Sequence, residues 1–74
     1  MASRIRSHLP ILRYEVYQRA VEQDEGVRLE GRVHKTGSLD NAKVVAERMV
    51  MVGSEAYILD RHSGNIARVS VTAD

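Results

Sequence analysis

The sequence predicts an α+β fold of order ββαββ, in which one helix packs on one face of a four-stranded antiparallel sheet. One stretch, residues 38–53, combines a capping residue, an apolar stripe at helical spacing and a final glycine. The segments on either side alternate apolar and polar residues with a period of two, which is typical of half-buried strands. At 74 residues the chain suits one domain, residues 11–74, preceded by a flexible segment, residues 1–10.

The helix is predicted to begin after Ser38, whose hydroxyl can accept a hydrogen bond from the free amides of the first turn. Gly53 suits the left-handed position that follows the last turn of a helix. Val44 and Met51 lie on the side opposite the apolar stripe. The residues expected to face the sheet are Leu39, Ala42, Val45, Ala46, Met49 and Val50.

The first predicted hairpin joins strands at residues 11–21 and 27–35 through a loop at residues 22–25. This loop length places Glu15 opposite Arg32 and Tyr14 opposite Val33, and it avoids pairing like charges directly across the strands. Strict alternation then puts His34 on the polar face, away from the helix.

The second predicted hairpin joins residues 55–61 and 65–71 through a type I turn with a glycine bulge, which pairs Arg61 with Asn65. That pairing directs Ile58 and Ile66 away from the helix. It gives a helix-facing set of Tyr57, Leu59, Ala67, Val69 and Val71. The sequence leaves open whether the two hairpins pair within one chain or exchange strands between chains.

The leading functional hypothesis is a small non-enzymatic binding or regulatory module that acts through protein contacts, as a homodimer or with another protein. It rests on apolar residues that the core does not need, together with one neighbouring arginine: Val44, Arg48, Met51, Ile58 and Ile66. The absence of cysteine fits a cytoplasmic location, and no apolar run is long enough to span a membrane.

The alternative hypothesis is nucleic-acid binding by the polar face of the first hairpin. Its candidate residues are basic or aromatic: Arg13, Tyr17, Arg19, Arg28, Arg32 and His34. Three observations weigh against it. The formal net charge is only +1, one tyrosine is a poor stacking platform, and Glu15 and Glu30 interrupt the arginines.

The remaining candidates are weaker. Gly37 and Ser38 precede the helix and could hold an anion there, but an ordinary turn with an N-cap explains them more simply. The three histidines have no metal-ligand spacing, so we expect neither a metal nor a cofactor. No carboxylate stands in an apolar context that would raise its pKa, and we expect the protein not to be an enzyme.

Overall fold

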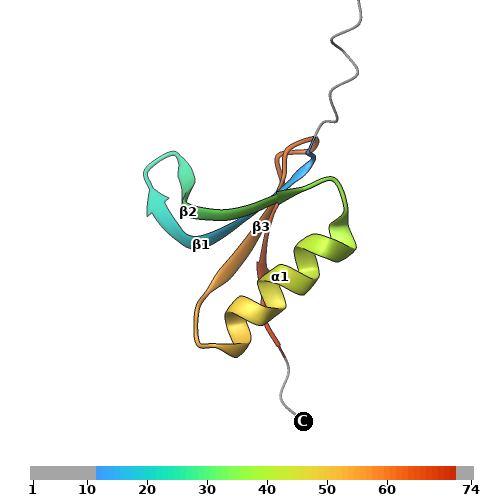
Figure 1. Cartoon of the computed structure of the whole chain (residues 1–74). Coiled ribbons are helices and arrows are strands. Elements are labelled where there is room, and N and C mark those ends of the chain that lie inside the picture. The colour runs from blue at the N-terminus through green and yellow to red at the C-terminus, as the bar shows by residue number, and fades with distance from the viewer. Residues whose placement is uncertain (1–11, 72–74) are drawn as a thin grey trace, which may run out of the picture.

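The computed structural model describes residues 12–71, and there it confirms the predicted ββαββ fold. The elements are β1 (Tyr14–Gln23), β2 (Gly26–Thr36), α1 (Leu39–Met51), β3 (Ala56–Asp60) and β4 (Ile66–Val69). The sheet has the strand order β2-β1-β3-β4 with antiparallel neighbours, and α1 packs across one face of it (Figure 1). The predicted flexible segment, residues 1–10, lies outside the described residues.

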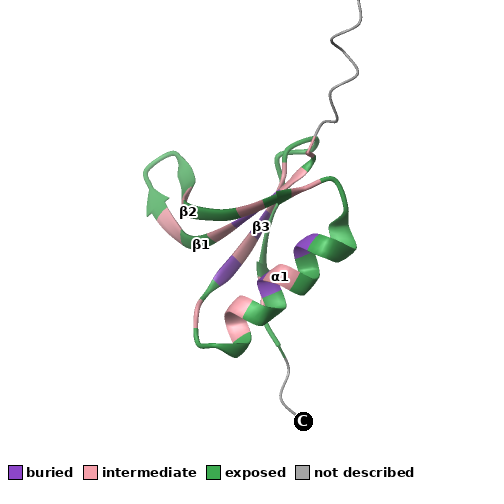
Figure 2. Cartoon of the chain, in the orientation of Figure 1, coloured by how far each residue is buried: buried purple, intermediate pink, exposed green. Residues whose placement is uncertain are grey.

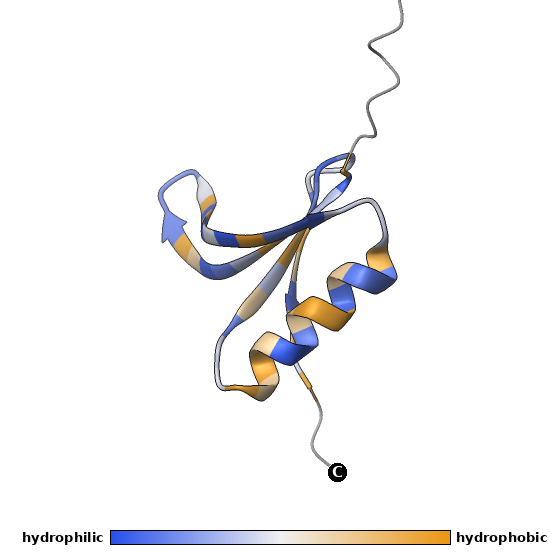
Figure 3. Ribbon diagram, viewed as in Figure 1, coloured by the Kyte–Doolittle hydropathy of each residue, from blue (hydrophilic) through white to orange (hydrophobic). Residues whose placement is uncertain are grey.

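Both predicted ends of the helix are confirmed. The Ser38 hydroxyl accepts the Asn41 N–H at 3.2 Å. At the other end, the Gly53 N–H donates to the Val50 carbonyl and the Ser54 N–H to the Met49 carbonyl. With Gly53 at φ +94°, these two bonds form a Schellman motif. Hydrophobic and hydrophilic residues alternate along α1 (Figure 3), as expected for a helix with one face on a sheet.

The first hairpin forms, but its predicted register is wrong by two residues. The prediction paired Gly26 with Val21, but Gly26 lies opposite Gln23. The loop therefore has two residues instead of four. Two-residue loops are the commonest connection in hairpins, and Gly26 has the positive φ that a tight connection requires. Near the loop the shift by two keeps each residue on its predicted face, and it places Arg19 opposite Glu30 and Tyr17 opposite Arg32. Beyond Tyr17 the offset grows to three residues, so Tyr14 lies opposite Thr36 and Glu15 opposite Lys35.

A bulge in β2 then changes the face of one predicted site residue. Tyr17 pairs with Arg32 and Val16 with His34, which leaves Val33 without a partner. The extra residue moves His34 to the helix side, where its Nε2 lies 2.7 Å from the Asn41 side-chain oxygen. The prediction that His34 lies on the polar face is therefore wrong.

The predicted register of the second hairpin is wrong by one residue. The Asp60 N–H donates to the Asn65 carbonyl, so the loop contains the four residues Arg61–Gly64 and not a three-residue turn. A shift of one residue reverses the face of one strand relative to its partner. β4 keeps its predicted face, with Val69 toward the helix, and β3 is the strand whose faces are reversed. Ala56 and Ile58 consequently face the helix, while Tyr57 and Leu59 face away from it.

The core lies between α1 and the two central strands, β1 and β3 (Figure 2). Its buried members are Val16, Ala42, Ala46, Ala56 and Ile58. β1 pairs with β3 of the same chain, so the two hairpins join edge to edge within one chain. Leu39 and Val71, which were predicted to be in the core, are 40% and 43% exposed.

The two isoleucines of the second hairpin test the observed register. Ile58 is 5% exposed and Ile66 is 41% exposed. We expect Ile58→Ala to lower the free energy of unfolding by about 2–5 kcal/mol, because it opens a cavity in a thin core. Ile66→Ala should lower it by less than about 1 kcal/mol. Urea denaturation followed by circular dichroism measures both changes, and the reverse order would contradict the observed register.

Candidate functional site

The sheet face opposite α1, here called the outer face, is not covered by any other element within residues 12–71. One row of four residues crosses it from edge to edge. Arg32 of β2 lies opposite Tyr17 of β1, which lies opposite Tyr57 of β3, which lies opposite Arg68 of β4. Directly opposite residues share a face of the sheet, so this cross-strand row presents two tyrosines between two arginines.

A second row lies beside the first, with Glu15 between Lys35 and Leu59. Glu15 is only 4% exposed although α1 does not cover it. Its carboxylate accepts a hydrogen bond of 2.5 Å from the Tyr17 hydroxyl and lies 3.3 Å from Arg32 Nη1 and 3.7 Å from Arg61 Nη1. The predicted alignment of Glu15 with Arg32 is thus wrong as a strand pair, yet their side chains form the ion pair diagonally.

The pKa values of this cluster follow from its contacts. Burial alone would raise the pKa of Glu15, but the Tyr17 hydrogen bond and the charges of Arg61, Arg32 and Lys35 together hold it below the usual value. The same hydrogen bond raises the pKa of the Tyr17 hydroxyl, and burial adds to the effect. Glu15 is therefore a charged group that orients its neighbours, and an ionised carboxylate of this kind is unsuited to act as a general acid.

The other two glutamates of the outer face, Glu30 and Glu55, also form ion pairs or hydrogen bonds with neighbouring side chains. Glu30 pairs with Arg28 at 2.6 Å and with Arg19 at 3.6 Å. Glu55 accepts a hydrogen bond of 2.9 Å from the Tyr57 hydroxyl, which raises the pKa of that hydroxyl. The arginines keep donors to spare, since a guanidinium carries five N–H groups and the Arg19 and Arg28 side chains are 60% and 59% exposed.

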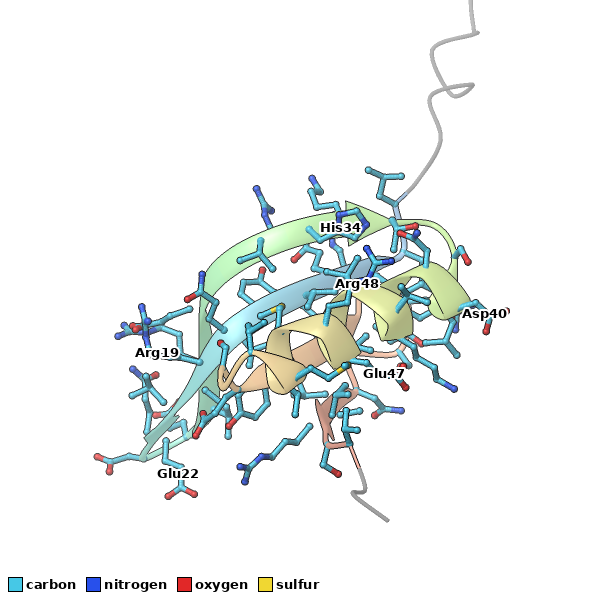
Figure 4. All side chains as sticks on the ribbon, turned by 60° about the horizontal axis from the view of Figure 1, so that its bottom comes forward. Arg19, Glu22, His34, Asp40, Glu47 and Arg48 are labelled. Carbon is cyan, nitrogen blue, oxygen red and sulfur yellow. The ribbon has the colours of Figure 1, made fainter. Side chains whose placement is uncertain are left out.

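Charge is segregated between the outer face and the rest of the described chain. The outer face carries three glutamates and six basic residues, which are Arg19, Arg28, Arg32, Lys35, Arg61 and Arg68. The rest of residues 12–71 carries three basic and six acidic residues. Figure 4 shows part of this division, with Asp40 and Glu47 on the helix and Arg19 on the hairpin away from it. The formal net charge of the chain is close to neutral, but its basic residues are concentrated on the outer face.

The structure brings four of the six residues predicted for nucleic-acid binding, Tyr17, Arg19, Arg28 and Arg32, onto the outer face. His34 lies on the helix side, as described above. Arg13 is held instead by Asp60, to which its Nε and Nη2 donate at 2.8 and 2.9 Å. Lys35, Tyr57 and Arg61 were not predicted for this face, whereas the predicted pairing already placed Arg68 on the side of the sheet away from the helix. The signal that could have found Tyr57 is the register of the second hairpin, because the one-residue shift moves Tyr57 to this face.

The residues predicted to form a protein interface do not form one surface. Ile58 is buried in the core, so its predicted exposure is wrong. Ile66 lies on the outer face beside Leu59, whereas Val44 and Met51 lie on the far side of α1. Met51 is 74% exposed, and Arg48 and Glu47 point to opposite sides of the helix (Figure 4).

The predicted anion site at Gly37 and Ser38 has two of its polar groups already engaged. The Ser38 N–H donates to the Thr36 hydroxyl at 3.1 Å, and the Ser38 hydroxyl accepts the Asn41 N–H. Across the described part of the chain, no three His, Cys, Asp or Glu residues are placed to hold a metal ion. None of its helices is both long enough and apolar enough to cross a membrane.

Comparisons with known proteins identify no relative of this chain. No family model matches the chain, and no curated protein or solved structure shows significant similarity to it.

The lowered pKa of Glu15 predicts how stability changes with pH. Its pKa is lower in the folded protein than in the unfolded chain, so unfolding takes up a proton in acid. The stabilisation is present above the unfolded pKa, and it is lost as pH falls through the lower folded pKa. We therefore expect the melting temperature of Glu15→Gln to fall less steeply than that of the wild type between about pH 5 and pH 3. Thermal melts across this range measure it, and parallel curves for the two proteins would contradict the assignment.

Proposed function

We propose that the outer face binds single-stranded nucleic acid. The observation that carries the proposal is the cross-strand row, Arg32–Tyr17–Tyr57–Arg68, on an uncovered and basic sheet face. Aromatic rings stack on bases of any identity, and flanking arginines bind the phosphates. The residues predicted for a protein interface give less support, because Ile58 is buried in the core and Ile66 lies on the sheet face opposite α1.

The dimensions of the row suit a short single strand. Neighbouring strands lie about 4.8 Å apart, so four residues in a row span about 14 Å. Tyr17 and Tyr57 lie on the two central strands and can each stack on one base. Arg32 and Arg68 at the two ends then meet the backbone before and after the stacked pair. A duplex, whose bases are already stacked and paired, could not use the tyrosines in this way.

Charge favours an anionic partner over a second copy of the same face. Six basic groups against three acidic groups leave the outer face with an excess of three positive charges. Two such faces brought together would repel each other, whereas their basic groups would neutralise phosphates and release the counterions bound to a nucleic acid. The glutamates oppose binding less than the sequence suggests, because Arg32, Arg61, Arg19 and Arg28 partly neutralise Glu15 and Glu30.

The tyrosines test the stacking contribution. We expect Tyr57→Ala to weaken binding of a fluorescent eight-nucleotide single strand about tenfold or more, since base–aromatic stacking contributes about 1–3 kcal/mol per base. Tyr57→Phe should retain most of the affinity, because it keeps the ring and loses only the hydroxyl. Fluorescence anisotropy at low salt measures both. An alanine variant that binds as tightly as the wild type would refute stacking on this face.

Two arginines test the electrostatic contribution. Arg68 ends the cross-strand row, and Arg48 lies on α1, away from the sheet face. We expect Arg68→Ala to weaken binding and to lower the slope of log affinity against log salt by about 0.7, which corresponds to one phosphate contact on a single strand. Arg48→Ala removes the same charge and should leave the slope unchanged. An equal effect of both variants would mean that binding reflects net charge and not this face.

A further inference from the structure

We infer, on the basis of the proposed function, that a hollow beside the cross-strand row is a subsite for one nucleobase and selects a base with an exocyclic amino group. The hollow has a volume of about 260 Å³ and opens where the end of α1 approaches the last strand of the sheet. Its lining residues are Val50, Gly53, Ser54, Glu55, Arg68, Val69 and Ser70.

The hollow adjoins the proposed nucleic-acid surface through two shared residues. Arg68 is both the last residue of the cross-strand row and part of the lining. Glu55 also lines the hollow, and it accepts the hydrogen bond of the Tyr57 hydroxyl. The apolar walls Val50 and Val69 lie on the helix side of the sheet. A strand whose bases stack on Tyr17 and Tyr57 and whose phosphate meets Arg68 would therefore place its next base in the hollow by passing around the free edge of β4.

The lining has the composition that a nucleobase requires. Val50 and Val69 are half-buried and offer apolar contacts to the faces of a ring. Ser54 and Ser70 add hydroxyl groups that can donate or accept a hydrogen bond. β4 is the last strand in the sheet order, so its outer edge carries backbone N–H and C=O groups that no other described strand pairs. The site thus combines apolar walls with polar groups that can bind the edge of a base.

Glu55 gives the site its preference for a base with an exocyclic amino group. One carboxylate oxygen, Oε1, accepts the Tyr57 hydroxyl at 2.9 Å, and Oε2 remains for a ligand. An ionised carboxylate only accepts hydrogen bonds, so it favours the amino group of cytosine, adenine or guanine. It disfavours uracil and thymine, which present a carbonyl oxygen at the position where cytosine carries its amino group. Cytosine and uracil have the same size, so this carboxylate should distinguish them by hydrogen bonding.

The experiment compares labelled tetranucleotides of cytidine and of uridine, with the deoxy versions of both, by fluorescence anisotropy. We expect the wild type to bind the cytidine oligomer about fivefold or more tightly than the uridine oligomer. Glu55→Gln should reduce that ratio to near one. Glu22→Gln is the matched control, because it also removes one exposed carboxylate but lies at the far end of the first hairpin (Figure 4). It should leave the ratio unchanged.

A second measurement does not depend on a variant. In the wild type, the amide resonances of Val69 and Ser70 should shift on addition of the cytidine oligomer and shift less with the uridine oligomer. Equal affinity for the two oligomers, or a ratio that Glu55→Gln leaves intact, overturns the inference and leaves the proposed function standing. Failure of every oligomer to bind the wild type overturns the proposed function itself.

Discussion

The hydrogen bonds of Asp60 are the constraint on which the rest of this structure depends. Its carboxylate accepts two bonds from the Arg13 guanidinium and one from the His62 N–H. Its carbonyl accepts the Gly64 N–H at 2.7 Å, and its own N–H donates to Asn65. The Arg13 bonds are the main cause that holds the pKa of Asp60 far below its usual value. Asp60 thereby closes the turn of the second hairpin and joins that hairpin to the first.

The turn that Asp60 closes decides which residues face the helix. Side chains alternate along a strand, so a hairpin closed one residue earlier or later would reverse the face of one strand relative to the other. In the observed register, Ile58 and Ala56 complete the core against Ala42 and Ala46. The same register brings Tyr57 beside Tyr17 on the outer face. One local set of hydrogen bonds thus fixes both the packing of the core and the composition of the candidate site.

The sequence predicted the fold better than the candidate site, for a physical reason. The ends of α1 were predictable because Ser38 and Gly53 act through bonds to their own neighbours. The strands were predictable from their alternation. Register was not, because it depends on turn geometry and on the bulge at Val33, neither of which the alternation reveals. The cross-strand row takes one residue from each of four strands, so no local motif marks it, and the error of one residue in the register of the second hairpin removes Tyr57 from it.

The buried Glu15 holds two residues of the outer face in place, although no other element within residues 12–71 covers that face. An isolated buried carboxylate is costly, but here Tyr17, Arg32 and Arg61 surround it and satisfy its oxygens. In return, the carboxylate fixes the orientation of a tyrosine and an arginine of the cross-strand row. Side chains already ordered in this way lose less conformational entropy when a ligand binds. A negative charge that seemed to argue against a nucleic-acid site thereby prepares the groups that would bind one.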